Sequence, residues 1–200
     1  MRALLEAEKP TVEFRGKRYR LDLSFDTVLL VQMLYDEEVL TNEEKIDQAL
    51  RMLVKQWFKV WLLDETARAQ LLEQITKEHI MTNRRPTQKQ SAKLLDFQHD
   101  SDYIYASFRQ AYGMDLTREC GKLPWKRFLD LLDGLPEKTK LKEVMRIRAM
   151  EIPKPTRYNQ KEIQNIIQLK AYYALPVKGG GGQQGLDLLF DTLARGARKM

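Results

Sequence analysis

The first part of the chain alternates apolar and polar residues around a short turn. In VEFRGKRYRLDL (12–23), Val12 and Phe14 precede Arg15-Gly16-Lys17, and Tyr19, Leu21 and Leu23 follow it at every second position. This period of two, interrupted at a glycine, predicts a β-hairpin. An isolated hairpin is marginal in water, so we expect it to rest on other elements.

After the hairpin the apolar spacing changes to three and four residues, which predicts helices. Ser24 is in position to begin one helix, and Thr41 with Glu44 forms a capping box that begins a second. We expect this second helix to run through residues 41–63 without interruption. Asp64 is expected to cap the next helix. The predicted buried stripe of the long helix comprises Ile46, Leu50, Leu53, Val54, Trp57, Val60 and Trp61.

The pattern divides the chain into four parts. Residues 1–81 are expected to form the N-terminal hairpin and helices. Residues 82–96 form a linker, because 82–93 is polar, contains Pro86 and has no periodicity. Residues 97–178 form a C-terminal helical region packed on the first part as one domain, and 179–200 a glycine tether with a tail helix. The predicted fold class is mainly α, a compact helical domain with a small N-terminal β-hairpin.

The segment DSDYIYASFRQAYGMDL (100–116) is rich in aromatic residues. Proteins that bind single-stranded nucleic acid interleave such residues with basic ones, whereas here only Arg109 interrupts the aromatic stretch. The helical spacing favours packing in the interior, with Gly113 as the helix C-cap. The aromatic residues concerned are Tyr103, Tyr105, Phe108 and Tyr112.

The amino-acid composition limits the classes of function that the protein can have. The 200 residues are 43% hydrophobic and 31% charged, enough to bury a core. No apolar run approaches the ~20 residues of a membrane span, and the N-terminus does not resemble a signal peptide, so a cytoplasmic protein is expected. The net charge of +6 permits binding to nucleic acid or acidic partners, but 28 acidic residues are interleaved with 34 basic ones.

No group of residues typical of a catalytic, cofactor or metal site is recognisable. The chain has two histidines and one cysteine, which excludes an internal disulfide and gives no zinc-ligand spacing. The adjacent letters of His99-Asp100-Ser101 do not form a hydrolase triad, whose members meet through the fold. Cys120 is expected to be a small, wholly or partly buried residue rather than a nucleophile. We therefore expect a protein that is not an enzyme and uses no cofactor or metal.

The predicted partner contacts are two groups of apolar side chains. Tyr103, Tyr105 and Trp125 are candidates, although core packing is the alternative for each. The tail helix follows a glycine tether, an arrangement expected to dock on its own domain or in a groove of another protein. Its candidate contacts are Leu186, Leu189, Phe190 and Leu193.

Several stretches together resemble a known family. They are YRLDLSFDTVLLVQMLYDEEVLTNEEKIDQAL, DSDYIYASFRQAYGMDL, KLPWKRFLDLLDGLPEKTKLKEVMRIRAMEIP and YNQKEIQNIIQLKAYYAL. Their sequences and their order along the chain are similar to those of the gene-product-fifteen family of tailed phages and prophages of Gram-positive bacteria. The resemblance covers most of residues 19–175 and departs at Pro124-Trp125-Lys126, where the family pattern reads His-Trp-Trp.

The resemblance implies a tail assembly chaperone that acts in the host bacterial cytoplasm during siphophage tail assembly. Its implied partner is the tape measure protein, with the tail tube protein, a second tail assembly chaperone and another copy of the chain as further candidates. Two alternatives remain open. One is a structural tail or connector component of the virion, and the other, favoured only by charge, is a nucleic-acid-binding protein.

Overall fold

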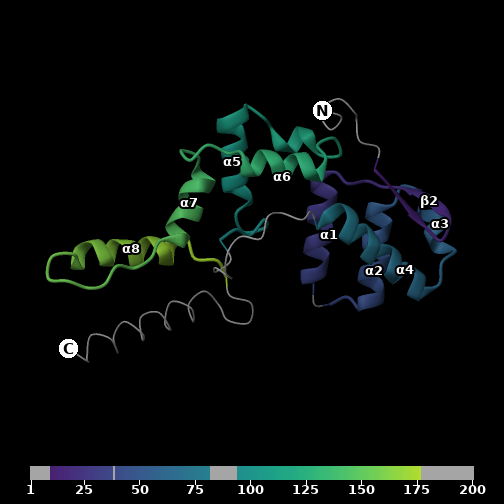
Figure 1. The fold of residues 1–200 in the computed structure, drawn as a ribbon, viewed down its shortest axis with the longest axis horizontal. Helices are drawn as coiled ribbons and strands as arrows, with labels where there is room; N and C mark the ends of the chain where they lie inside the picture. The colour runs from purple at the N-terminus through teal and green to yellow at the C-terminus, as the bar shows by residue number, and fades with distance from the viewer. Residues whose placement is uncertain (1–9, 38, 82–93, 177–200) are drawn as a thin grey trace. The chain divides into compact units, whose positions relative to one another are not determined.

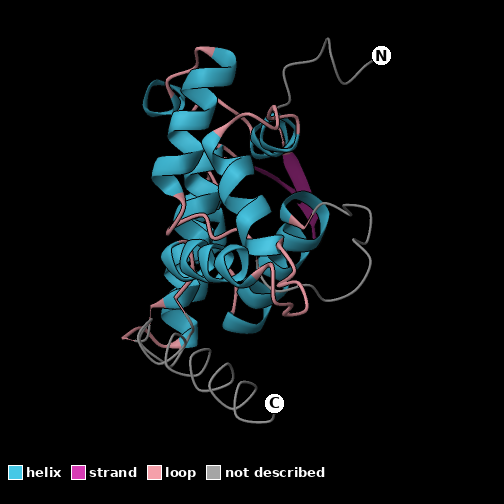
Figure 2. Cartoon of the chain, turned by 90° about the vertical axis from the view of Figure 1, so that its left-hand side faces the viewer, coloured by secondary structure: helices cyan, strands magenta, loops and turns pink. Residues whose placement is uncertain are grey.

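The computed structural model describes residues 10–37, 39–81 and 94–176, and helices make up most of these residues. The strands in these ranges form a two-stranded antiparallel sheet near the N-terminus (Figures 1 and 2). The predicted fold class, mainly α with an N-terminal hairpin, is confirmed. The non-periodic stretch 82–93 of the predicted linker, and the tether and tail helix with Leu186, Leu189, Phe190 and Leu193, lie outside the described residues.

The hairpin joins β1 (Thr11–Phe14) to β2 (Lys17–Arg20), with Val12 opposite Tyr19. Arg15 and Gly16 form the turn, with φ angles of 48° and 71°. Positive φ at both central residues gives the twist that matches the flanking strands, and glycine adopts it without strain. Because the side chains alternate, Val12, Phe14 and Tyr19 are buried while Arg18 and Arg20 of β2 point outward.

The contacts group the described residues into two units. Unit 1 contains residues 10–81 and 114–134, and unit 2 contains residues 94–113 and 135–176. Residues 114–134, which the sequence places in the C-terminal region, therefore group with the N-terminal part. The division at residues 82–96 stays a prediction.

The helices of unit 1 are arranged around α2, which packs between α1 and α4. Residues 114–134 join this group through the backbone, because the Phe25 amide donates to the Leu123 carbonyl (2.9 Å) and the Trp125 amide to the Leu23 carbonyl (2.8 Å). As a result α6 packs on α1. The helices are α1 (Phe25–Asp36), α2 (Asn42–Leu53), α3 (Trp57–Trp61), α4 (Glu65–Ile75), the π-helical η2 (Thr76–Ile80), the 3₁₀ turn η3 (Leu116–Glu119) and α6 (Trp125–Asp133).

Two of the predicted N-terminal caps form as expected. The Glu44 amide donates to the Thr41 hydroxyl (3.3 Å) and the Thr41 amide donates to the Glu44 carboxylate (2.8 Å), which completes the capping box. The Asp64 carboxylate accepts from the Ala67 amide at 2.7 Å. Ser24 stands at the N-cap of α1, but its hydroxyl donates to Asp22 (2.9 Å) and makes no cap bond.

The prediction of one long helix over residues 41–63 was wrong, because α2 ends at Leu53. Val54 then pairs with Leu21 in an antiparallel bridge, and the Lys55 amide donates to the Arg20 carbonyl at 3.0 Å. The backbone is extended here in order to hold the end of the hairpin. The chain resumes as the separate helix α3, whose residues do not continue the stripe of α2.

Unit 2 contains α5 (Ser101–Tyr112), α7 (Lys140–Ala149) and α8 (Gln160–Tyr172), with α7 in contact with both of the others. Gly113 ends α5 with φ 64°, as its predicted C-cap role requires. The buried Ser107 hydroxyl of α5 accepts from the Leu141 amide in the first turn of α7 (3.0 Å). The apolar core of the unit consists of Ile104, Phe108, Leu135, Leu141, Val144, Ile147 and Ile167.

Candidate functional site

The aromatic residues of α5 differ in burial. Phe108 is fully buried, whereas Tyr105 and Tyr112 are 39% and 37% exposed. The expectation that all four rings lie in the interior was therefore wrong for these two. Ile104, Ser107 and Phe108 define the buried face, and Tyr105 is rotated by one residue, about 100°, from Ile104. The candidate contact Tyr105 thus lies on the outer side of α5.

The other two described candidate contacts are less accessible. Tyr103 is half-buried and packs edge-on against Tyr173, the residue directly after α8, with ring centroids 6.1 Å apart. Trp125 begins α6 and is 4% exposed. Its indole Nε1 donates to the Ile80 carbonyl (3.2 Å), and its ring stacks on Phe128 (5.6 Å). Trp125 is therefore held within unit 1.

A more exposed apolar group lies on α3 and at its C-cap, Leu62. Phe58, Trp61 and Leu62 are 66%, 70% and 72% exposed, and we call these three residues the α3 surface. Val60 is the buried residue of this short helix. The sequence analysis placed Trp61 on a buried stripe and did not single out the other two. A usable signal was present, because WFKVWLL (57–63) is apolar at every position except Lys59, and a helix of this kind cannot bury every side on one neighbour.

Cations surround the α3 surface. Residues 48–63 contain Arg51, Lys55 and Lys59 but no acidic residue. The Arg51 guanidinium lies over the Trp57 ring, 5.2 Å from its centroid. The hairpin adds Arg18 and Arg20, and the Arg20 amide donates to the Gln56 side chain at 2.9 Å, which places β2 beside the start of α3 (Figure 1).

An apolar hollow lies elsewhere on unit 1, bounded by the end of α1, α2 and α4 with η2. Its volume is about 420 Å³, and its apolar lining includes Tyr35, Ile46, Leu72 and Met81. Burial raises the pKa of the Tyr35 phenol, so this group stays neutral at physiological pH. The hollow can accommodate an apolar side chain of a partner.

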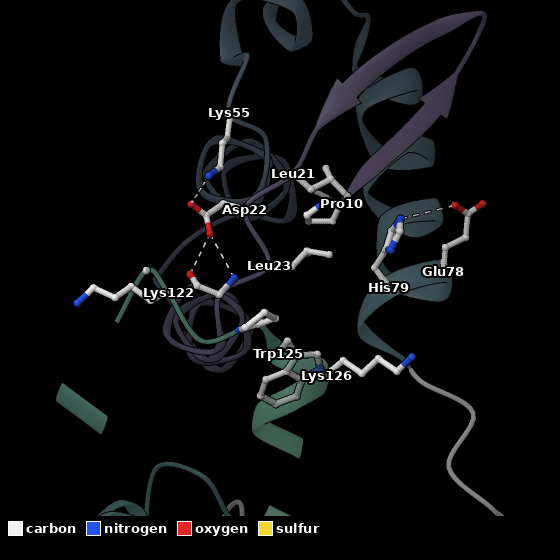
Figure 3. A pocket seen from close by; sticks show the side chains of 13 residues that line it. Pro10, Leu21, Asp22, Leu23, Lys55, Glu78, His79, Lys122, Trp125 and Lys126 are labelled. Carbon is white, nitrogen blue, oxygen red and sulfur yellow. Dashed lines mark hydrogen bonds and ion pairs between the residues drawn. The ribbon is translucent and has the colours of Figure 1, made fainter. Parts of the chain in front are cut away.

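The larger pocket in Figure 3 has a volume of about 480 Å³ and mixes charges of both signs. Asp22 pairs with Lys55 (3.4 Å) and accepts from the Ser24 hydroxyl, while His79 Nε2 lies 3.9 Å from a Glu78 oxygen. Lys122 and Lys126 extend in opposite directions in Figure 3. Asp22 and Lys55 are thus engaged with each other, Lys122 and Lys126 point apart, and His79 Nε2 is buried without a hydrogen-bond partner.

Cys120 is exposed, in contrast to the expected burial. Desolvation, followed by the nearby Asp26 carboxylate, raises the pKa of its thiol. Since the thiolate is the nucleophilic form, this environment does not activate Cys120. In the described ranges, no three His, Cys, Asp or Glu side chains are grouped so that they could hold a metal ion.

The fold and these surfaces define a small α-helical protein with exposed apolar side chains, together with a mixed-charge pocket. Comparison with known families identifies it further: the chain belongs to the bacteriophage Gp15 protein family, whose model matches residues 5–175. No curated protein and no solved structure matches the chain significantly. Within the described part of the chain, no helix has the length and apolarity needed to cross a bilayer.

Proposed function

We propose that this phage protein is a non-enzymatic tail assembly chaperone that binds the tape measure protein in the cytoplasm of a Gram-positive host infected by a siphophage. The observation that carries the proposal is the α3 surface, where Phe58, Trp61 and Leu62 are each about two-thirds exposed or more (66–72%). Contiguous exposed apolar side chains are typical of surfaces that bind other proteins.

The physical task of such a chaperone follows from its proposed client. A tape measure protein is a long helical chain with apolar stripes that would aggregate before a tail tube encloses them. A helical protein with an apolar surface can cover those stripes by the same contacts that pack helices together. The chaperone must release the tape measure protein to tube subunits, which requires a moderate binding affinity. A binding surface formed by few side chains meets this requirement.

Co-expression of the tape measure protein with and without this chain tests the proposal. We expect the tape measure protein to become soluble and to co-purify with the chain. Unchanged solubility together with no co-purification would exclude the chaperone function. The alternative of a structural tail or connector component makes a different prediction, namely that the chain is present in purified virions by mass spectrometry, from which a chaperone is absent.

The nucleic-acid alternative is supported by the exposed cations of the hairpin, Lys17, Arg18 and Arg20. Binding to phosphates would weaken steeply as salt is added. No retention on immobilised DNA at low salt would exclude this alternative. The tail tube protein, a second chaperone and self-association remain candidate interactions, and pull-downs with each purified protein test them.

A further inference from the structure

The α3 surface is unusual in the described part of unit 1 because three adjacent large side chains are exposed on one short helix. Elsewhere on the unit, Val39 and Met81 are 89% and 67% exposed but are far apart in the sequence, and Leu30 and Met33 on α1 are 52% and 42% exposed. Removing apolar side chains of this size from water favours binding. A partner that covers all three residues would therefore gain a substantial driving force for binding.

The charges near this surface indicate what kind of partner fits. Lys59 lies on α3 itself, and the outward-facing Arg18 and Arg20 lie on the neighbouring strand. Of the acidic groups close by, Asp22 pairs with Lys55 (3.4 Å) and Asp64 with Arg15 (3.5 Å), Glu13 lies opposite Arg18 in the hairpin, and Glu65 interacts with Glu43. An apolar surface with a cationic margin complements an apolar stripe with an acidic margin.

We propose that the α3 surface, with Lys59, Arg18 and Arg20 at its margin, is the docking site for an amphipathic protein helix whose apolar stripe is flanked by carboxylates. This inference rests on the proposed function in taking another protein as the partner. It goes further by assigning the surface on this chain and the charge of the segment that the surface accepts.

A protein helix fits these residues better than a nucleic acid does. Sequence-independent binding of single strands depends on aromatic faces on which bases stack. Here the Arg51 guanidinium lies over the Trp57 ring, and Leu62, the most exposed of the three surface residues, has no aromatic face. Leucine and phenylalanine side chains of a helix can contact Phe58, Trp61 and Leu62 equally well.

Binding of labelled synthetic peptides to the full-length chain, measured by fluorescence anisotropy, tests the proposal. The first peptide is a helix with leucine and phenylalanine on one face and glutamates along its margins. A matched peptide carries lysine at each glutamate position, and a single-stranded thymidine oligonucleotide is the third probe. We expect the acidic peptide to bind, with the lysine peptide at least about tenfold weaker.

Two variants locate the binding site. Phe58→Ser combined with Trp61→Ser should weaken binding of the acidic peptide at least about tenfold, as expected for loss of aromatic anchors. Lys59→Glu combined with Arg20→Glu should reverse the preference toward the lysine peptide. Leu30→Ser combined with Met33→Ser, on α1, is the matched control and should leave binding unchanged. Circular dichroism verifies that each variant is folded.

Several results would overturn the inference. The inference is wrong if the acidic peptide does not bind, or if it binds the wild type and both α3-surface variants equally. It is also wrong if the wild type binds the lysine peptide or the oligonucleotide more tightly than the acidic peptide. A peptide with the sequence of residues 183–200 serves as a competitor. If it binds the α3 surface more tightly than the acidic peptide, the occupant is the C-terminal segment of this chain and a separate partner is excluded.

The two proposals can fail separately. If the chain solubilises the tape measure protein but the α3-surface variants do so equally well, the chaperone function stands and the assigned surface is wrong. If the acidic peptide binds at the α3 surface but the tape measure protein remains insoluble, the assignment of the docking surface is supported. The proposal that the tape measure protein is the partner is then wrong.

Discussion

Arg148 and Asp100 form a bidentate ion pair in the interior of unit 2, with N–O distances of 2.6 and 2.7 Å. Their side chains are 6% and 0% exposed. The same guanidinium donates to the Leu94 carbonyl before α5 (2.9 Å) and to the Tyr173 carbonyl after α8 (2.6 Å). One planar side chain thus holds three segments that are distant in sequence, a task that suits arginine because its donors form a fixed fork.

Breaking this pair should strongly destabilise unit 2. Asp100→Asn leaves the Arg148 charge buried without a counterion, and we expect a loss of about 3–5 kcal/mol in the free energy of unfolding. Urea titration followed by circular dichroism measures the loss, and amide hydrogen exchange localises it to unit 2. The control is Glu143→Gln, which breaks a partly exposed pair with Lys140 in the same unit and should cost less than about 1 kcal/mol. Similar losses in both variants would contradict the proposed role of burial.

The Ser107 hydroxyl provides a second test of how α5 and α7 are joined. It accepts from the Leu141 amide at 3.0 Å, and the Thr139 side chain at the N-cap of α7 makes no cap bond of its own. Ser107→Ala leaves a buried amide without a partner, so we expect a loss of about 1–3 kcal/mol in the free energy of unfolding. Ser101→Ala, at the exposed start of α5, is the matched control. Equal unfolding midpoints for the two variants would show that the hydroxyl contributes nothing to stability.

Local signals in the sequence predicted the elements whose causes are local. Arg15-Gly16 produced the expected turn, Thr41 with Glu44 the capping box, and Gly113 the end of α5. In each case the backbone conformation depends on residues within one turn.

The features that the sequence did not predict depend on distant residues. Continuous helical periodicity through Val54 was overridden by its pairing with Leu21, more than thirty positions earlier, and the break exposed Trp61. Ser107 and Leu141 are likewise far apart in the chain, so no spacing rule connects them. Trp125 could not be distinguished from a surface aromatic before its bond to Ile80 was known.

Two helix caps should make the stability of unit 1 depend on pH. Hydrogen bonds from the Thr41 amide and then its hydroxyl lower the pKa of Glu44, and the Ala67 amide lowers the pKa of Asp64. A carboxyl whose pKa is lower in the folded state stabilises that state above its unfolded pKa, and the contribution is lost as the pH falls through the folded pKa.

The variant Glu44→Gln with Asp64→Asn separates this titration from capping itself. Glutamine and asparagine retain cap geometry but carry no charge, so at neutral pH the double variant should be less stable than the wild type, in which both ionised carboxylates and the Asp64–Arg15 pair (3.5 Å) contribute. Between roughly pH 5 and pH 3 the variant should lose less stability than the wild type, because two of the protonation steps are removed. Asp130→Asn, at an exposed position of α6, is the control. Parallel curves of unfolding midpoint against pH for wild type and double variant would contradict the role assigned to the caps.

The contrast between Trp61 and Trp125 can be measured in solution by acrylamide quenching of tryptophan fluorescence. The chain contains three tryptophans. Trp57→Phe with Trp125→Phe leaves Trp61, and Trp57→Phe with Trp61→Phe leaves Trp125. At 70% exposure, Trp61 should be quenched strongly and emit at long wavelength, whereas Trp125, at 4%, should be protected and emit at shorter wavelength. The wild type labelled with fluorotryptophan provides a control that needs no substitution, since solvent isotope shifts of its ¹⁹F resonances also report exposure. Protection of Trp61 in both experiments would mean that the α3 surface is covered in the free protein, and equal quenching of the two residues would place Trp125 at the surface.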